Sequence, residues 1–348
     1  MHIRKALSFD DVLLVPRKNQ LNSRSEVDLS TSVAGVSLHI PIIAANMPSV
    51  CASNMQGAMQ SLGGLGIHHR MCSIEEQEQA VALMFGRGGF SIGIDSSWKE
   101  RAAACARFRP GDISPGKIDM IACIDVAHGH QSRVIEVAQE FLSEYSDIPL
   151  IVGNIATGAA VHEFVVKLPD KDHHRVALKV GVGGGSVCTT RIETGCGVPT
   201  FTSIVDTVSE HSGFSIIADG GIKNSGDIVK SLAAGADAVM LGSLLAGTEE
   251  APGDIISYDN ALYKIYRGSA SYGTKKASSQ QTNHVEGVES LVPYKGKVHK
   301  VLDKLLNGVR SGFTYCGATN LTDLRANAKF IEITPAGMSE SKPHLAGR

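Results

Sequence analysis

The chain has 348 residues, with 33 Lys and Arg against 35 Asp and Glu, and 43% of its residues are hydrophobic. A net charge of −2 leaves no basic surface for nucleic acid or anionic membranes, so neither partner is expected. The apolar content predicts a folded globular protein and excludes the disordered class. Glycine accounts for 37 of the 348 residues, which is above its usual share of about 7%.

Nothing along the sequence predicts export or membrane insertion. Arg4, Lys5, Asp10 and Asp11 interrupt the apolar residues of the N-terminus, unlike the core of a signal peptide. No run reaches the ~18 apolar residues of a transmembrane helix. Seven cysteines are scattered without a C-x-x-C pair, which argues against a disulfide framework and a structural zinc site. We therefore expect a reduced, cytoplasmic protein.

Eight short apolar runs, each followed by a helix-like stretch, predict parallel strands that are buried on both faces. They begin at Pro41, Gly63, Phe90, Met120, Pro149, Val176, Ser215 and Ala238. Eight strand-helix repeats sum to a (β/α)8 TIM barrel more simply than to a doubly wound sheet, since no G-x-G-x-x-G follows the first run. The expected fold is α/β, with the barrel over about residues 35–250.

Helix signals lie between these runs. Ser73 and Glu76 have the spacing of a capping box at the start of a helix. Apolar residues recur at helical spacing over 131–145, 159–168 and 225–234.

Two segments depart from the repeat. Residues 181–214 form the longest connection, and residues 248–296 have little apolar content. Both are predicted to be lids or binding loops. Residues 298–309 and 321–330 predict two helices that pack back on the barrel, and the polar tail past Ile333 is expected to be loosely held.

The loop after the sixth run reads GVGGGSVCTTR from Gly181 to Arg191. Dense glycines let backbone N–H or C=O groups approach an ion, because no Cβ intervenes. Loops at the carboxyl ends of barrel strands form the active site, and this one delivers Cys188. Neighbouring positive charge and amides favour a thiolate, so Cys188 is a candidate nucleophile. A cysteine that is only a small buried hydrophobe is the alternative.

The seventh and eighth runs end in Asp219-Gly220-Gly221 and Leu241-Gly242-Ser243. Barrels commonly hold a phosphate here on backbone N–H groups, although the glycines could equally serve only to form tight turns. Asp219 could bind ribose hydroxyls or cap its own loop.

The fourth run ends in Asp125, followed closely by His128 and His130. These residue types suggest a metal, but the sequence offers no third ligand at a recognisable spacing. Polar contacts to a second ligand in the barrel mouth are the favoured interpretation.

These motifs occur together in one known family. GVGGGSVCTTR, IADGGI, VMLGSLLAGTEEAPG, YRGSAS and VPYKG follow in order, after FDDVLLVP at Phe9. The chain thus resembles the IMP dehydrogenase and GMP reductase family over nearly its whole length. The resemblance implies a TIM barrel, typically tetrameric, that binds a purine nucleoside monophosphate and a nicotinamide cofactor. It also implies a covalent thioimidate on Cys188.

The same resemblance sets the expected domain organisation. It implies one catalytic domain over 1–348, with a mobile flap over about 268–292 and C-terminal helices over about 297–330. IMP dehydrogenases usually insert CBS modules after the second strand, whereas residues 80–89 here lead directly into the third. The expected assembly is a homotetramer without CBS modules.

Within the family, the chain is most similar to GMP reductases. The dehydrogenase activates water with an Arg-Tyr pair in its flap, and this chain has no arginine between Ser271 and Glu286. IDVAHGH and residues 242–271 are also closer to reductases. The expected reaction is NADPH-dependent reductive deamination of GMP to IMP and ammonia, in purine salvage.

Two alternatives stay open. The tail FIEITPAGMSESKPH is more like a dehydrogenase, and Gly184 stands where the family usually has proline. One alternative is therefore an IMP dehydrogenase without CBS modules, which converts IMP and NAD to XMP. The other is a nucleotide-binding protein without turnover.

The resemblance also implies roles for single residues. Thr190 and Glu286 would protonate the departing ammonia, with Glu289 as the fallback for Glu286. The nucleotide would contact Ser186, Asp219, Gly220, Gly221, Gly242, Ser243, Gly268, Ser269 and Ala270. NADPH would contact Asp125, Val126, Ala127, Val182 and Gly183, and also Ser23 and Arg24 of a neighbouring subunit. Arg24 would pair with the 2′-phosphate. Backbone carbonyls of Gly183, Gly185 and Cys188 resemble the family's K+ site.

Overall fold

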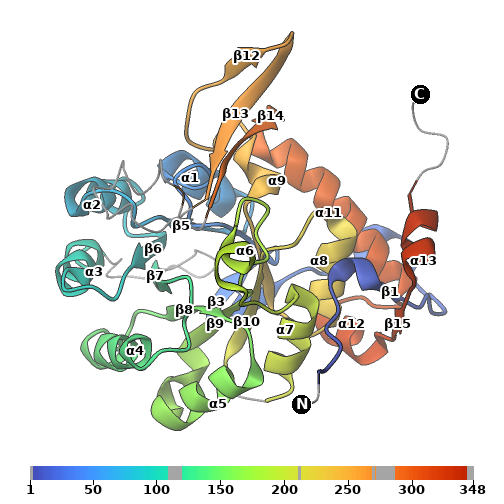
Figure 1. Cartoon of the computed structure of the whole chain (residues 1–348), viewed down its shortest axis with the longest axis horizontal. Helices are drawn as coiled ribbons and strands as arrows, with labels where there is room; N and C mark the ends of the chain where they lie inside the picture. The colour runs from blue at the N-terminus through green and yellow to red at the C-terminus, as the bar shows by residue number, and fades with distance from the viewer. Residues whose placement is uncertain (1–2, 109–119, 211–212, 269–270, 272–286, 343–348) are drawn as a thin grey trace.

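The computed structural model describes residues 3–108, 120–210, 213–268, 271 and 287–342. Eight parallel strands close into a barrel in the order β10-β11-β4-β5-β6-β7-β8-β9 (Figure 1). They are β4 (Ile42–Ala44), β5 (Leu65–His68), β6 (Gly88–Ile92), β7 (Met120–Asp125), β8 (Leu150–Ile155), β9 (Val176–Val180), β10 (Ser215–Asp219) and β11 (Ala238–Leu241). Each corresponds to one of the eight apolar runs, so the predicted TIM barrel is confirmed.

Helices alternate with the strands and cover the outside of the barrel (Figure 1). They are α1 (Ser53–Ser61), α2 (Ile74–Leu83), α3 (Trp98–Ala106), α4 (Ser132–Glu144), α5 (Gly158–Lys167), α7 (Thr200–Val208) and α8 (Ser225–Ala233). The predicted capping box is present: Glu76 N donates to Ser73 Oγ, and Ser73 N donates to Glu76 Oε2. On α4, the apolar residues that predicted the helix form its buried face.

The barrel strands are buried along nearly their whole length, because helices cover them outside and neighbouring side chains fill the interior. In β4, for example, Ile42 and Ile43 are fully buried. Lys179 in β9 is as buried as its apolar neighbours, with 2% of its surface exposed, although its side chain is charged.

The connection after β9 is not a plain loop. It contains the short helix α6 (Thr190–Thr194) and then α7. The prediction for residues 181–214 was therefore too simple. Pro199 begins α7 at its N-cap position, and α7 then buries Phe201 and Ile204 against the barrel.

The segment after β11 also contains more structure than predicted. Following α9 (Ser243–Ala246), strands β12 (Ile256–Tyr258), β13 (Ala261–Arg267) and β14 (Glu289–Pro293) form an antiparallel sheet that projects from the barrel (Figure 1). Asp259 and Asn260, with φ of 48° and 60°, form the β12–β13 turn. Positive φ at both central residues matches the right-handed twist of a hairpin. The sequence analysis missed this turn signal.

Near the C-terminus the structure corrects a boundary. Helix α11 (Val298–Tyr315) is followed by α12 (Leu321–Asn327), but Phe330 lies in strand β15 (Phe330–Glu332) and not in a helix. Strand β15 pairs antiparallel with β1 (Val12–Leu14). The tail past Ile333 then forms α13 (Pro335–Glu340), where a loosely held segment was expected.

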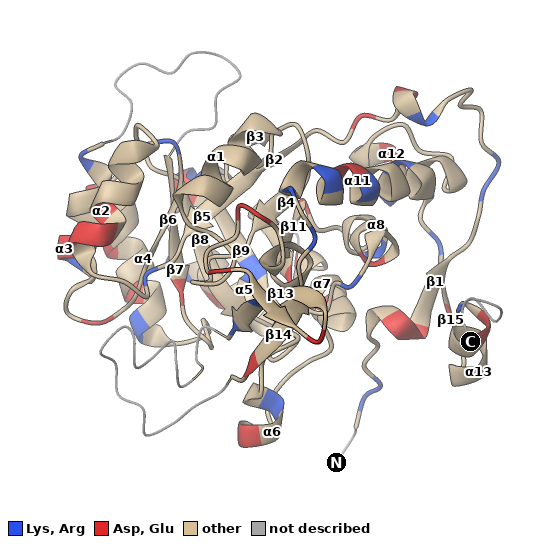
Figure 2. Ribbon diagram, turned by 90° about the horizontal axis from the view of Figure 1, so that it is seen from above, with Lys and Arg blue, Asp and Glu red and all other residues tan. Residues whose placement is uncertain are grey.

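Smaller elements complete the N-terminal half. They are the 3-10 helices η1 (Phe9–Asp11), η2 (Arg24–Glu26) and η3 (Asp170–Arg175), and the hairpin of β2 (Thr31–Val33) and β3 (Val36–Leu38). In Figure 2 basic and acidic residues are spread over many of the helices and loops, in keeping with the small net charge. Within the described ranges, no helix is both long enough and apolar enough to cross a bilayer.

Candidate active site

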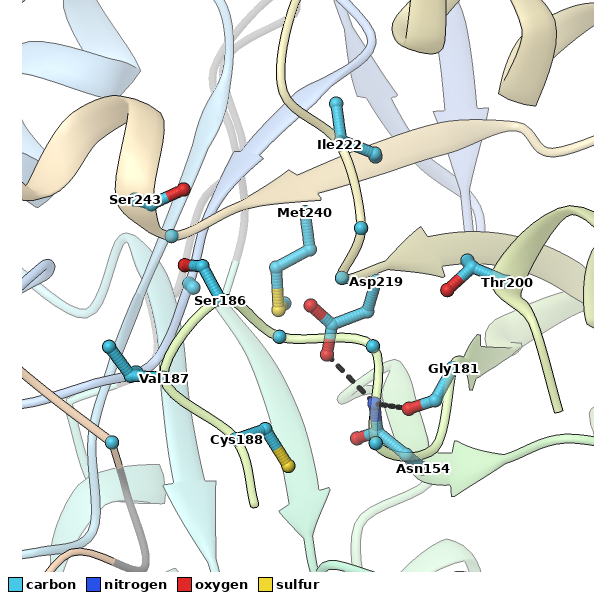
Figure 3. Close-up of a pocket in the computed structure, with 18 of the residues that line it drawn as sticks. Asn154, Gly181, Ser186, Val187, Cys188, Thr200, Asp219, Ile222, Met240 and Ser243 are labelled. Carbon is cyan, nitrogen blue, oxygen red and sulfur yellow. Dashed lines mark hydrogen bonds between the residues drawn. The ribbon is translucent and has the colours of Figure 1, made fainter. Parts of the chain in front are cut away.

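A cavity of about 650 Å³ opens at the carboxyl ends of the barrel strands. Its walls come from the loops after β7, β9, β10 and β11, together with η1 and the end of β13. Figure 3 shows Ser186, Cys188, Asp219 and Ser243 around this space. Ligand sites of small molecules commonly have volumes of about 300–1,000 Å³, so the cavity can hold a nucleotide.

The loop after β9 requires glycine where it meets the loop after β10. Gly181 has φ of 143°, and a Cβ there would lie 1.9 Å from the carbonyl oxygen of Asp219. Gly220, with φ of 88°, lies in the loop after β10, and a Cβ there would lie 3.1 Å from the backbone of Gly184 and Gly185. The two loops are therefore in backbone contact, which brings the predicted nucleophile loop beside the predicted phosphate loop.

Cys188 lies on the cavity wall, half-buried. Its Sγ is 3.2 Å from Oγ1 of Thr190, the first residue of α6. A β-bridge joins Cys188 to Gly287, and Val288 N donates to Val187 O at 2.9 Å. The chain that follows residue 286 is thus held against the nucleophile loop.

Arg191 connects the two ends of its loop. Its guanidinium donates to the carbonyl of Val182 at 3.2 Å and to that of Val198 at 2.7 Å. Arg191 and Cys188 line the same cavity. The favouring of the Cys188 thiolate by this charge stays a prediction.

The phosphate prediction concerns backbone amides at the opposite end of the cavity. Ser186, Gly221, Gly242 and Ser243 all line it. No hydrogen bond from any of these four amides to the protein is present in the described part of the chain. Converging amides without protein acceptors are the arrangement that binds an anion.

A buried charge network at the floor of the cavity was not predicted. Lys179 Nζ lies 3.1 Å from Asp125 Oδ1 and 3.3 Å from Asp219 Oδ2. Asn154 joins it, because its Nδ2 donates to Asp219 Oδ2 at 2.8 Å and its Oδ1 accepts from Lys179. Arg70 Nε donates to the Asp125 carbonyl oxygen at 3.0 Å. The side chains of Asp125 and Asp219 are thus held together by one lysine.

The network shifts the protonation equilibria of its members. Burial disfavours the charged form of Lys179, but attraction to Asp125 and Asp219 outweighs it and raises the lysine pKa. Burial likewise opposes the charge of Asp125, yet Lys179 and Arg70 hold the pKa of this carboxyl below its usual value. Lys179 and Asp125 are therefore both charged at neutral pH.

Tyr266 is a second residue that the sequence analysis missed. It lines the cavity near Gly242, where a Cβ would lie 2.7 Å from the tyrosine hydroxyl. Burial raises the pKa of Tyr266 to about 12, although a hydrogen bond with Ser186 opposes this shift. The phenol is consequently a neutral hydrogen-bonding group at the predicted phosphate end.

Most of the predicted residues meet in this one cavity. Those that line it are Asp125, Val126, Ala127, Gly183, Gly185, Ser186, Cys188, Thr190, Asp219, Gly220, Gly221, Gly242, Ser243 and Gly268. Val182 is 8% exposed, and its carbonyl accepts from Arg191. Ser23 and Arg24 are exposed and lie outside the cavity of this chain. Ser269, Ala270 and Glu286 lie outside the described residues.

Glu289 and the two histidines do not line the cavity. Glu289, the fallback for Glu286, forms an exposed ion pair with Arg267 at 3.2 Å. His130 Nε2 lies 2.6 Å from Glu163 Oε2, and the His128 ring is 6.3 Å from that of His130. Contacts of His128 and His130 with a ligand in the barrel mouth are thus not supported, because neither lines the cavity and His130 is paired with Glu163 of α5.

Comparison with known proteins agrees with this geometry. A family model described as the IMP dehydrogenase / GMP reductase domain matches residues 6–344. The inosine-5'-monophosphate dehydrogenase of Methanocaldococcus jannaschii is 34% identical, over 98% of this chain and 95% of that protein. The enzyme of the same name from Borreliella burgdorferi is 34% identical, over 98% and 97% respectively. That of Cryptosporidium parvum is 36% identical, over 99% and 96%.

The alignment lengths add one detail. The match to the Methanocaldococcus jannaschii protein extends over 481 positions, more than the 348 residues of this chain. That relative therefore has residues that this chain lacks.

Proposed function

The chain belongs to the IMP dehydrogenase/GMP reductase family, and from this premise we propose that it moves hydride between a nicotinamide cofactor and C2 of a purine nucleoside monophosphate, through a covalent bond to Cys188. One observation carries the proposal: Cys188 and Thr190 share a cavity with four amides that have no protein acceptor among the described residues. A nucleophile and an anion site in one pocket suit a substrate with a reactive ring and a phosphate.

For the direction of the reaction we propose reduction of GMP. Oxidation of IMP must end with attack of water on the intermediate, which needs a group that activates water. The segment 271–286 contains no arginine for that purpose, and this supports a step in which hydride attacks instead. Glu286 follows from the same proposal as the acid for ammonia, supported by the β-bridge between its chain neighbour Gly287 and Cys188.

Oxidation of IMP with NAD is the second candidate. The relatives described above are all named inosine-5'-monophosphate dehydrogenase, and these names favour it over GMP reduction. Both reactions use the same nucleophile and the same nucleotide site, so the choice between them requires an activity measurement.

In the proposed reduction, Cys188 Sγ forms a bond to C2 of guanine. The bond from C2 to the 2-amino nitrogen breaks, and the nitrogen leaves as ammonia after it accepts a proton relayed by Thr190 and Glu286. Hydride supplied by bound NADPH then adds to C2, and the C–S bond breaks to give IMP and free Cys188.

The remaining groups are proposed as binding partners. Amides of Ser186, Gly221, Gly242 and Ser243 would hold the phosphate, and Asp219 the ribose hydroxyls. Residues 125–127 and Gly183 would hold the cofactor, and they line the same cavity. Ser23 and Arg24 would reach it only from another subunit of a tetramer.

A potassium site at Gly183, Gly185 and Cys188 also remains a proposal. Carbonyl oxygens are suitable ligands for a hard cation. Gly185 O already accepts a hydrogen bond from Cys188 N at 3.1 Å, and a carbonyl has a second lone pair for an ion.

The test is a pair of assays on the purified chain that follow the absorbance of the reduced nicotinamide. One contains GMP and NADPH, and the other IMP and NAD, each with and without potassium. Loss of NADPH with release of IMP and ammonia supports the reductase. Formation of NADH and XMP would replace it with the dehydrogenase, and silence in both assays would contradict either enzyme.

The matched variants are Cys188→Ala and Cys196→Ala. We expect Cys188→Ala to lose turnover by at least about 10³-fold while it still binds nucleotide, since the nucleophile is not needed for the phosphate contacts. Cys196 is exposed and does not line the cavity, so its removal should change turnover little. Equal activity of the two variants would show that Cys188 is not the nucleophile.

A further inference from the structure

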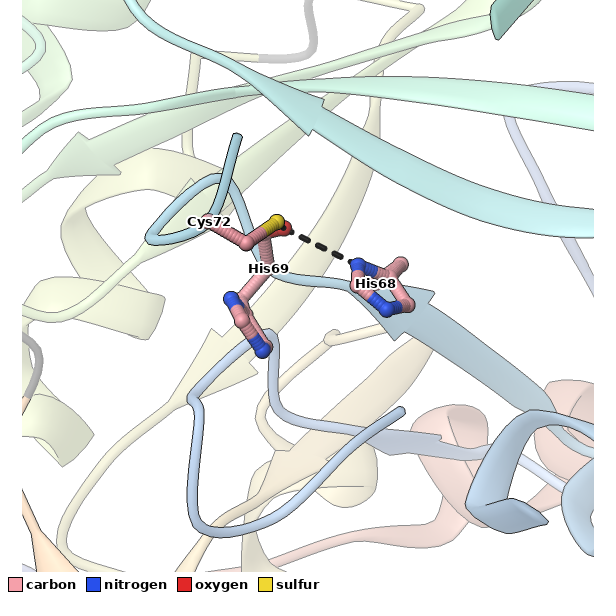
Figure 4. A group of neighbouring side chains, drawn as sticks. All are labelled: His68, His69 and Cys72. Carbon is pink, nitrogen blue, oxygen red and sulfur yellow. Dashed lines mark hydrogen bonds between the residues drawn. The ribbon is translucent and has the colours of Figure 1, made fainter. Parts of the chain in front are cut away.

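A group of three metal-binding side chains lies outside the candidate active site. His68 ends β5, His69 follows it, and Cys72 comes just before the first turn of α2 (Figure 4). One ligand atom from each lies within 4.8 Å of the other two. A separate small pocket opens onto them, lined also by Ser53 of α1 and Glu76 of α2.

One ring nitrogen of His69 has no hydrogen-bond partner among the described residues. His69 is only 9% exposed, and its Nδ1 is buried without a partner in the described part of the chain. A buried polar atom without a partner costs about 1–3 kcal/mol in a typical protein, so such an atom calls for an explanation. A bound cation that accepts the lone pair of this nitrogen would supply one.

A hydrogen bond to the backbone sets the tautomer of His68. Its Nδ1 lies 3.0 Å from the carbonyl oxygen of His69. Since a carbonyl can only accept, Nδ1 carries the proton, and Nε2 of the neutral ring keeps a free lone pair. Histidine ligands in metal sites typically donate their other ring N–H to a carbonyl or carboxylate in this manner.

The two rings lie side by side at the pocket and stack with their centroids 4.8 Å apart.

We propose that His68, His69 and Cys72 bind a Zn²⁺ ion. Two imidazoles and a thiolate are a preferred ligand set for zinc, and the C-x-x-C spacing that the sequence lacks is not required for it. Ligand atoms around tetrahedral zinc lie about 3.5 Å apart, so the observed separations need a contraction of about 1 Å. On binding, the Cys72 thiol loses its proton to solvent and a Zn–S bond forms, with no change of oxidation state.

Among the described residues, negative groups outnumber positive ones around the proposed zinc site. The Cys72 thiolate and the carboxylate of Glu76, on the same pocket, offer two negative charges. Arg101 opposes a cation, but its guanidinium is committed to Cys72 O at 3.0 Å and to Gln77 Oε1 at 2.9 Å. The fourth position on zinc is open to water or to Glu76 from the pocket.

The site would connect to the cavity through the backbone alone. Arg70, between His69 and Cys72, lines the active-site cavity and donates to the Asp125 carbonyl. Zinc would therefore fix both ends of the short segment that presents Arg70. The proposal does not rest on the proposed function, because metal content can be measured without any assay of turnover.

The experiment uses the untagged full chain, reduced and stripped with a chelator, then loaded with Zn²⁺ and desalted. We expect about one zinc per chain by elemental mass spectrometry, and at least a tenfold lower content in Cys72→Ser and His69→Asn. The control Cys196→Ser, at an exposed cysteine outside the cluster, should retain zinc. Zinc absent from the wild type, or retained equally by Cys72→Ser, overturns the proposal.

Two further readouts keep the test decisive if a variant does not fold. Wild-type protein loaded with Co²⁺ should show a thiolate-to-cobalt charge-transfer band, and Zn²⁺ should slow alkylation of Cys72 by iodoacetamide at least tenfold. Cys196, followed in the same digest, should react at an unchanged rate. No charge-transfer band and no protection of Cys72 would contradict the site.

Discussion

The charged environment of Lys179 differs from what its apolar neighbours in the sequence suggest. Lys179 lies in a strand of apolar residues, yet its ammonium is held between Asp125 and Asp219 below the cavity. Such a group stabilises the fold only while its partners are present, because burial penalises each charge separately. The position of Asp219, the proposed ribose contact, therefore depends on the charge of Lys179.

We expect Lys179→Met to lower the free energy of unfolding by about 3–5 kcal/mol, since it removes the counter-charge that Asp125 and Asp219 share and leaves Arg70 as the remaining cation near Asp125. Chemical denaturation at neutral pH measures this. The matched control is Lys99→Met, because Lys99 forms an exposed ion pair with Glu140 and should matter far less. Equal losses in the two variants would show that the buried network contributes no more than a surface pair.

The network also predicts how stability varies with pH. The lowered pKa of Asp125 stabilises the folded chain above the ordinary carboxyl pKa of about 4, and this contribution is lost as pH falls through the folded value. In Lys179→Met the burial of Asp125, which favours its protonated form, is opposed mainly by Arg70, so acid should relieve part of the defect. The difference in unfolding free energy between wild type and variant should thus shrink as pH falls from 7 toward 4. A difference that stays constant over that interval contradicts the assignment.

At the scale of elements, local sequence signals are sufficient to predict a helix or strand when its stabilising contacts are also local. Ser73 and Glu76 predict the start of α2, and the structure has both reciprocal hydrogen bonds. We expect Ser73→Ala to cost about 1 kcal/mol in unfolding free energy. Ser97, the N-cap of α3, accepts no bond from the first turn of its helix, so Ser97→Ala should cost less in the same measurement. The reverse order would contradict a role for the capping box.

Elements that depend on distant partners could not be predicted in this way. Phe330 has an apolar environment suited to a helix or a strand, and its pairing with Leu14 decides for the strand. Strand β13 has a local signal in its turn to β12, but its pairing with β14 joins segments that are separated in the sequence. Pairings between residues far apart in the sequence leave no periodic trace in either segment.

The residues of the candidate site also fall into those that local sequence signals predict and those that depend on distant partners. Glycine-dense loops and a cysteine at a strand end mark the residues that the resemblance then assigns. Lys179, Asn154 and Tyr266 were missed because their roles come from partners on other strands. A lysine within the apolar run VALKV was the available signal, since a buried strand tolerates a charge only when it is paired.

At the scale of the whole molecule, the two ends of the chain meet and support the cavity wall. Strand β1 pairs with β15, and Ile333 N donates to Asp11 O at 2.8 Å. The Phe330 ring lies 4.9 Å from that of Phe201, which in turn lies 6.2 Å from Phe9 on the cavity wall. The C-terminal strand therefore reaches the proposed nucleotide site through two aromatic contacts.

We accordingly expect Phe330→Ala to lower the unfolding free energy by about 1–2 kcal/mol, less than a fully buried phenylalanine would, and to weaken nucleotide binding about threefold to tenfold. The binding effect arises because Phe201 loses its outer support and Phe9 can shift. Ile331→Ala, at an exposed position on the same strand, is the control for general damage to β15. Calorimetric titration with GMP and with IMP measures the affinity. If both variants bind equally well while Phe330→Ala alone is destabilised, the aromatic contacts hold the chain ends together without shaping the cavity.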